Sequence, residues 1–190
     1  MALRLRPRRM PWGDYGNILW NGMGRHLPRI RGLMQLERTG PFMPPISEPG
    51  GFVVSAEGRR LWESVNLRGV DFRNVRKARI VRLDWHDWDL DAPEPREYPR
   101  EGEPEGYILN RRHSWSVSRQ LGPAWEIWSV DTTELSGGGD ERMRAIRDHF
   151  AGNAELDVFR DGEWRATYCS DKAGEKLARV FGDLIRLEAV

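Results

Sequence analysis

The sequence predicts an α+β fold: a single domain with a mainly antiparallel sheet and two to four helices. Three observations support this prediction. The 190 residues suffice for one large domain, and nine tryptophans, six phenylalanines and four tyrosines can fill a core. Strand-like alternation recurs along the chain, whereas helical periodicity is confined to a few segments. Finally, a stretch of strand, helix and strand occurs twice.

The repeated stretch covers residues 52–75 and again residues 167–190. Each copy begins with strand formers and then a serine, whose hydroxyl is placed to cap the polar helix that follows. Each copy ends in a second strand-like alternation. With one residue of slip, the aligned positions are Ser55 with Ser170, Gly58 with Gly174, and Leu61 with Leu177. We interpret this similarity as a strand-helix-strand pseudo-repeat.

Further elements lie between the two copies. Residues 77–85 are the clearest strand candidate, and a change of phase in their alternation indicates a bulge. Asp140 is placed to cap an amphipathic helix over residues 141–152. Residues 155–170 predict a hairpin around Asp161-Gly162, a strong turn signal. Other strand candidates are residues 51–54, 69–75 and 122–131.

The N-terminal quarter shows weaker patterns. Residues 1–10 are expected to form a flexible basic arm, and residues 11–190 the domain itself. The stretch from Gly16 to Gly24 is typical of a short strand. Residues 26–51 are dense in proline and glycine, which disfavour helices and central strands. We therefore expect residues 26–51 to form an ordered loop over the core.

Charge is distributed unevenly along the chain. Residues 1–40 hold eight arginines against two carboxylates, whereas residues 84–105 hold nine carboxylates against two arginines. Residues 84–106 also contain four prolines and no apolar periodicity, which predicts a long acidic excursion from the domain. Such polarity favours oriented association with a charged protein partner, with tryptophans as apolar anchors. The side chains expected to bind this partner are Trp85, Asp87, Trp88, Asp89, Asp91, Glu94, Glu97, Glu101, Glu103 and Glu105.

Motifs for catalysis or cofactor binding are absent from the sequence, which has no P-loop, GxGxxG, GxSxG, HExxH or EF-hand pattern. We therefore expect neither enzymatic activity nor a cofactor. One alternative is a metal-dependent hydrolase, because residues 84–91 place His86 among four aspartates. Another is a nucleic-acid-binding regulator, because the basic arm with Trp12 and Tyr15 could contact phosphates and bases. The acidic excursion argues against nucleic acid, since it would repel it.

The compartment follows from cysteine use and hydropathy. Cys169 is the single cysteine, so neither an internal disulfide nor a cysteine-based zinc site can form. We expect Cys169 to be a packed thiol in a reducing compartment. The basic N-terminus is followed by no apolar run, and no stretch approaches the length of a membrane span. The sequence therefore predicts a cytoplasmic protein without membrane association.

Residues 52–75 resemble the recurring segment of bacterial immunity proteins from polymorphic-toxin systems, in the family numbered eleven, formerly a domain of unknown function. That segment has an apolar run with a serine, a helix and then L-x-G-V-x-F. The matching residues here are Ser55, Leu67, Gly69, Val70 and Phe72. Residues 158–190 resemble the closing segment of the family, with Phe159, Ser170 and Leu177 in place.

The resemblance covers roughly half of the chain. The proline-rich residues 35–51 and the acidic excursion are not features of that family. The resemblance implies a small cytosolic protein with no catalysis and no cofactor. Such a protein binds a cognate toxin delivered by a neighbouring cell and occludes the active site of that toxin.

Overall fold

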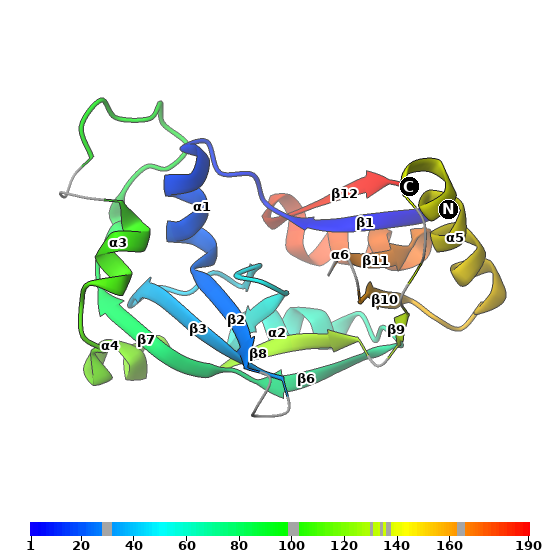
Figure 1. Ribbon diagram of the computed structural model, residues 1–190, viewed down its shortest axis with the longest axis horizontal. Coiled ribbons are helices and arrows are strands. Elements are labelled where there is room, and N and C mark those ends of the chain that lie inside the picture. Colours follow the sequence, from blue (N-terminus) through cyan, green and yellow to red (C-terminus); the bar gives the residue numbers. More distant parts are fainter. Residues whose placement is uncertain (28–31, 99–102, 130, 134, 136–137, 163–165) are drawn as a thin grey trace. The chain divides into compact units, whose positions relative to one another are not determined.

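The computed structural model describes residues 1–27, 32–98, 103–129, 131–133, 135, 138–162 and 166–190, and its fold class is α+β as predicted (Figure 1). Its helices are α1 (Gly13–Asn21), α2 (Ala56–Ser64), α3 (Pro104–Leu109), α4 (Trp115–Gln120), α5 (Gly139–Gly152) and α6 (Asp171–Phe181), with the 3-10 turns η2 (Trp85–Asp87) and η3 (Gly182–Leu184). Within the described ranges, no helix has both the length and the apolar character needed to cross a membrane.

Twelve strands are present in the described part of the chain. They are β1 (Ala2–Pro7), β2 (Met23–Leu27), β3 (Leu33–Gly40), β4 (Ile46–Ser47), β5 (Val53–Ser55), β6 (Val70–Asn74), β7 (Arg76–Arg82), β8 (Ala124–Ser129), β9 (Thr132–Thr133), β10 (Val158–Asp161), β11 (Thr167–Ser170) and β12 (Ile185–Ala189). The chain forms two compact units. Unit 1 is Met1–Arg8, Arg59–Phe72 and Ile127–Val190, and unit 2 is Arg9–Gly58 and Arg73–Glu126.

Unit 1 is built on a five-stranded sheet of order β12-β1-β11-β10-β9. The expectation of a flexible N-terminal arm is wrong, because Ala2–Pro7 forms β1, which pairs antiparallel with both β11 and β12 (Figure 1). Its backbone is therefore hydrogen-bonded along both edges. The alternation of Leu3 and Leu5 with Arg4 and Arg6 is the strand signal that the basic composition obscured.

The predicted hairpin and helix of unit 1 are confirmed in outline. Strands β10 and β11 pair antiparallel, while the residues of the turn after Gly162 lie outside the described part. Helix α5 starts two residues earlier than expected, with Gly138 as its N-cap and no side-chain cap bond. Asp140 lies in the first turn instead, where a carboxylate is stabilised by the positive end of the helix dipole. The apolar cluster beneath α5 contains Ala2, Ile146, Phe159, Ala166 and Tyr168.

Unit 2 contains a three-stranded sheet of order β2-β3-β7, in which β2 is antiparallel and β7 parallel to β3. Two expectations are wrong here. The stretch from Gly16 to Gly24, expected to be a strand, begins inside helix α1. Residues 26–51, expected to be a loop, contain the last two residues of β2 and all of β3 and β4. Their prolines flank β3 in the sequence, so the strand interior keeps every amide that the sheet needs.

The predicted bulge in β7 is confirmed. Leu36 pairs with Lys77 and Glu37 pairs with Arg79, which leaves Ala78 as an extra residue on β7. Met34, Leu36 and Ile80 from this sheet are fully buried, and they form one core cluster with residues of α4 and β5. Sequence reasoning therefore located β7 correctly but missed its partner strand.

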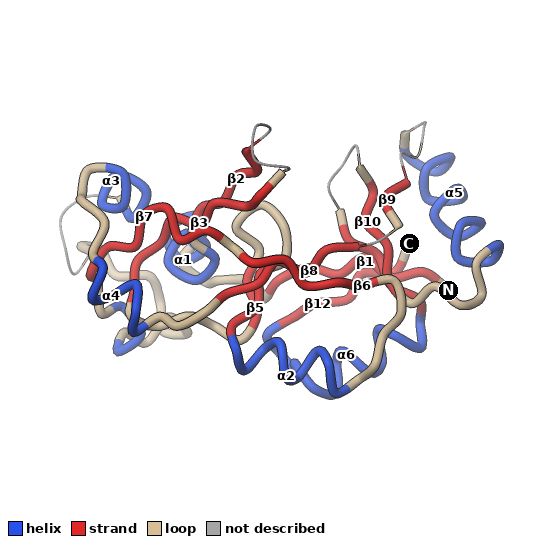
Figure 2. The backbone as a smooth tube through the Cα atoms, turned by 90° about the horizontal axis from the view of Figure 1, so that it is seen from below, coloured by secondary structure: helices blue, strands red, loops and turns tan. Residues whose placement is uncertain are grey.

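The pseudo-repeat is visible in the topology of two sheets, the five-stranded sheet of unit 1 and a four-stranded sheet of order β4-β5-β8-β6. In the four-stranded sheet, β8 lies between β5 and β6, the strands before and after α2. In the five-stranded sheet, β1 lies between β11 and β12, the strands before and after α6. The serine caps are equivalent too: Ser55 Oγ accepts from the Gly58 amide, and Ser170 Oγ from the Ala173 amide, both at 3.3 Å. Figure 2 shows the two capped helices, and Trp62 of α2 lies 6.0 Å from Phe181 of α6.

Candidate functional site

The described residues of the acidic excursion are an ordered part of unit 2. We call residues 84–98 together with residues 103–106 the acidic segment. The ring of Tyr98 stacks on Tyr15 of α1 with a centroid distance of 3.8 Å and an interplanar angle of 2°. Trp88 stacks on Trp12 at 6.4 Å, and the Trp12 indole N–H donates to the carbonyl oxygen of Ala92 at 3.0 Å. Aromatic contacts from α1 and the residue before it therefore hold both ends of residues 88–98.

A side-chain turn and a second helix complete this order. The Asp89 carboxylate accepts from the amides of Asp91 and Ala92, at 3.1 and 3.2 Å. Leu90 within this turn is buried. The acidic segment then ends in α3, which begins with Pro104 in its first turn. The sequence predicts a loop up to residue 106, and the helix was missed because its apolar residues are too few to show a period.

The structure leaves the predicted carboxylates on the surface. The exposed members of the predicted set are Asp87, Asp89, Asp91, Glu94, Glu97, Glu103 and Glu105, whereas Glu101 lies outside the described residues. Trp88 is half-buried. Trp85 is only 2% exposed, with its ring 6.1 Å from Trp20 and 5.4 Å from Phe42. The prediction of Trp85 as a partner contact is therefore wrong, because its indole belongs to the protein's own core.

The electrostatics of the acidic segment are visible in two tyrosines. A hydrogen bond from the Tyr98 hydroxyl to Glu94 is the largest cause that raises the pKa of Tyr98 to about 12, and the charges of Glu94 and Glu103 add to it. Burial, followed by the charge of Glu103, raises the pKa of Tyr15. A phenolate is thus disfavoured at both rings, as expected where carboxylates gather.

The structure also describes residues of the two alternative predictions, metal binding at residues 84–91 and nucleic-acid binding by the N-terminal arm. In the described residues, which include all of 84–91, no three or more His, Cys, Asp or Glu side chains gather to hold a metal ion. His86 lies 3.4 Å from Asp87, while Asp84 pairs with Arg82. The nucleic-acid alternative needs a free arm and exposed rings, but β1 lies within a sheet and Trp12 and Tyr15 are buried.

The single cysteine behaves as predicted. Cys169 is fully buried on β11, where it pairs with Leu3 of β1 and with Val158 of β10. Burial, with a smaller contribution from the charge of Asp171, raises the pKa of this thiol to about 12. A thiol that stays protonated is a poor nucleophile, so Cys169 is a packing residue.

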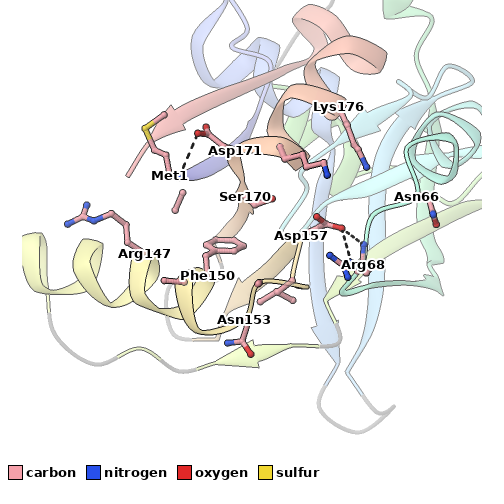
Figure 3. A pocket seen from close by; sticks show the side chains of 15 residues that line it. Met1, Asn66, Arg68, Arg147, Phe150, Asn153, Asp157, Ser170, Asp171 and Lys176 are labelled. Atoms are coloured by element: carbon pink, nitrogen blue, oxygen red, sulfur yellow. Dashed lines mark hydrogen bonds and ion pairs between the residues drawn. The ribbon is translucent and has the colours of Figure 1, made fainter.

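Sequence reasoning missed a pocket of about 590 Å³ that lies within unit 1 (Figure 3). Its walls come from the start of β1, the turn after α2, the end of α5 with the loop that follows, and the first turns of α6. Four segments distant in sequence thus contribute to it. A pocket built from separate segments has no short sequence motif that would predict it. The charged lining residues are Arg68, Arg147, Asp157, Asp171, Lys172 and Lys176.

A buried ion pair fixes one wall of this pocket. Arg142 of α5 donates from Nε to Asp161 Oδ2 of β10 at 2.9 Å, with a second bond from Nη2, and both side chains are 0% exposed. A bidentate pair of this kind constrains orientation as well as distance. It therefore sets the position of Arg147 and Phe150, which lie further along α5 and line the pocket.

Comparison of the chain with models of protein families, with curated proteins and with solved structures finds no match.

Proposed function

We propose that this protein is a cytoplasmic immunity protein, which binds a cognate toxin domain through the acidic segment and occludes the active site of that toxin. The observation that carries the proposal is the order of the acidic segment. Stacked tyrosine and tryptophan pairs hold it, while its carboxylates face solvent. The contact residues of the proposal are Asp87, Trp88, Asp89, Asp91, Glu94, Glu97, Glu103 and Glu105.

Order matters because a preformed surface loses little conformational entropy when it binds. Ordering a rotamer-rich side chain at an interface costs about 0.5–1.5 kcal/mol, and a free loop would add the cost of its backbone. The stacking of Tyr98 on Tyr15 removes much of that cost before the partner arrives. The half-buried ring of Trp88 adds an apolar contact next to Asp87 and Asp89.

The charge of the segment selects the chemistry of the partner. Seven exposed carboxylates of the predicted set face solvent in the described residues of the acidic segment, with Arg96 as an exposed cation among them. A field of one sign speeds association with a surface of the opposite sign and disfavours acidic proteins. The partner is therefore basic at its contact face. That the partner is a toxin rests on the resemblance of residues 52–75 and 158–190 to immunity proteins.

Capture of the partner tests the proposal first. The tagged chain is purified from its own producing cells, and bound proteins are identified by mass spectrometry. The expected result is one stoichiometric partner whose C-terminal domain has toxin activity that the purified chain abolishes. A partner that stays fully active when bound would contradict the proposal.

Neutralising the acidic segment then locates the contact. We expect the association rate to fall by about tenfold at low salt and its salt dependence to flatten, since steering is lost. The melting temperature should not change, because the altered side chains are exposed. The four changes are Asp87→Asn, Asp91→Asn, Glu97→Gln and Glu103→Gln. Surface plasmon resonance across a salt series measures the rates.

A matched variant controls for net charge. It removes four exposed carboxylates elsewhere on the chain, and it should retain the association rate of the unaltered protein within about twofold, because steering depends on local charge. The control changes are Glu141→Gln, Asp148→Asn, Glu175→Gln and Asp183→Asn. Equal rates for the two variants would place the contact away from the acidic segment.

A further inference from the structure

We propose that the pocket of unit 1 binds a small molecule that carries a phosphate chain of two or more phosphates, with an additional contact for a flat ring. Its volume of about 590 Å³ lies within the range of roughly 300–1,000 Å³ typical of small-molecule sites. It is lined by residues of unit 1 alone. It shares no residue with the acidic segment, so this inference is independent of the proposed immunity function.

The charges of the lining favour an anion. Four cationic side chains line the pocket against two carboxylates. Asp157 is engaged by Arg68, whose amide donates to it at 2.9 Å and whose Nε lies 3.6 Å away. Lys176 donates to the neutral carbonyl of Val65 at 3.2 Å and so keeps its charge uncompensated. In the described part of the chain, no carboxylate pairs with Arg147 or Lys172.

Helix α6 places two of these cations where they are locally unfavourable. Lys172 and Lys176 are four residues apart, so they share a face of the helix, and like charges at this spacing repel by about 0.2–0.5 kcal/mol. Lys172 also lies in the first turn, at the positive end of the helix dipole. A bound phosphate would relieve both costs, because it would neutralise the ammonium groups and complement the dipole.

The pocket also has an apolar side. Figure 3 shows Phe150 and Ser170 between Arg147 on one side and Lys176 with Arg68 on the other. One T-shaped contact with Phe159, at 5.1 Å, holds the Phe150 ring. Phe150 is half-buried and lines the pocket with Leu156 and three alanines. A ligand ring can pack there while its phosphates reach the lysines, which is the arrangement that a nucleotide fits.

Titration calorimetry of the full chain with ADP and, separately, with inorganic tripolyphosphate tests this inference. The variant Lys172→Ala/Lys176→Ala should bind either ligand at least about tenfold more weakly, since charge-assisted hydrogen bonds are lost. The control Arg144→Ala/Arg179→Ala removes two exposed cations of the same unit outside the pocket and should bind as the unaltered chain does. Melting curves confirm that both variants are folded.

The two ligands distinguish the source of the phosphates. If Phe150→Leu weakens ADP and leaves tripolyphosphate unchanged, the ligand is a nucleotide. If tripolyphosphate binds as tightly as ADP to the unaltered protein and to the Phe150→Leu variant alike, the ligand is an inorganic phosphate chain. The inference is overturned if neither compound binds at millimolar concentration, or if the lysine variant and its control lose affinity equally. Neither result bears on partner capture through the acidic segment.

Discussion

Helices α2 and α6 begin alike and differ in what lies against their first turns. Each is preceded by a strand and capped by a serine hydroxyl at 3.3 Å, and each has a glycine in its first four residues. A Cβ on Gly58 would lie 1.6 Å from the carbonyl oxygen of Pro45. A Cβ on Gly174 would lie 2.5 Å from Cδ1 of Leu3. One glycine thus faces backbone and the other faces the end of a side chain.

The comparison teaches which parts of a repeat are local and which are not. A serine cap needs only its own helix, so both copies keep it with the same geometry. The contact of the glycine depends on a neighbour supplied from elsewhere in the chain. Pro45 precedes β4, and Leu3 is on β1. The two glycines, which align with one residue of slip, are therefore expected to tolerate substitution very differently.

The largest expected effect is that of Gly58→Ala. The backbone of Pro45 cannot move without disturbing its hydrogen bond from the Ser55 amide at 3.2 Å. We expect a loss of more than about 3 kcal/mol in the free energy of unfolding, as for severe overpacking. Urea denaturation followed by circular dichroism measures it. A loss no larger than that of Gly174→Ala would contradict this prediction and would show that the two glycines are equivalent.

Gly174→Ala should cost less. Leu3 and Leu187 meet the new methyl with their terminal carbons, at 2.5 and 3.2 Å, and both can change rotamer. Alanine also favours the helix by up to about 1 kcal/mol over glycine, which offsets part of the clash. The net loss expected in the same urea experiment is about 1 kcal/mol. If Gly174→Ala lowers the free energy of unfolding as much as Gly58→Ala does, a contact with a side-chain end is as restrictive as a contact with backbone, and the distinction drawn here is wrong.

The caps themselves should be equivalent. Ser55→Ala and Ser170→Ala each remove one acceptor for a first-turn amide, so each should cost about 1 kcal/mol in unfolding free energy. Thermal and urea unfolding of the two variants, with threonine at the same positions as the conservative control, checks this. If the unfolding free energies of the two alanine variants change by amounts that differ by more than about 0.5 kcal/mol, tertiary neighbours also affect the strength of the caps.

The smallest effects concern charges along the helices. In α2, Arg59 donates to Glu63 four residues later at 2.7 Å, whereas α6 has lysines at the corresponding spacing, residues 172 and 176. Glu63→Gln should destabilise the protein by about 0.3 kcal/mol, and Lys172→Gln should stabilise the ligand-free protein by a similar amount. Melting temperatures at low and high salt resolve the signs, because salt should diminish both effects.

Local features of the fold were predictable from the sequence, and distant ones were not. The caps at Ser55 and Ser170 and the bulge in β7 follow from residues that are neighbours in sequence. The pairing of strand β1 could not be predicted from its own residues, because its partners β11 and β12 lie more than 150 positions later in the sequence. Strand β3 was not predicted, because the prolines that flank it in the sequence disfavour a central strand.

The candidate sites divide in the same way. Exposure of the acidic carboxylates could be predicted, since charge is rarely buried without a partner. The burial of Trp85 could not, because it depends on Trp20 and Phe42, which come from other segments. The pocket of unit 1 could not be predicted either, because it exists only once four separate segments have met.

The place of β1 in its sheet has a consequence for how the chain folds during synthesis. Arg6 and Glu188, which pair across β1 and β12, are 182 positions apart. Closing so long a loop has an entropic cost, and proteins dominated by such contacts fold slowly. The residues of unit 2 end at Glu126, so they leave the ribosome well before β11 and β12, the partners of β1. Until those partners emerge, β1 is an unpaired strand with two open edges and is exposed to chaperones and to aggregation.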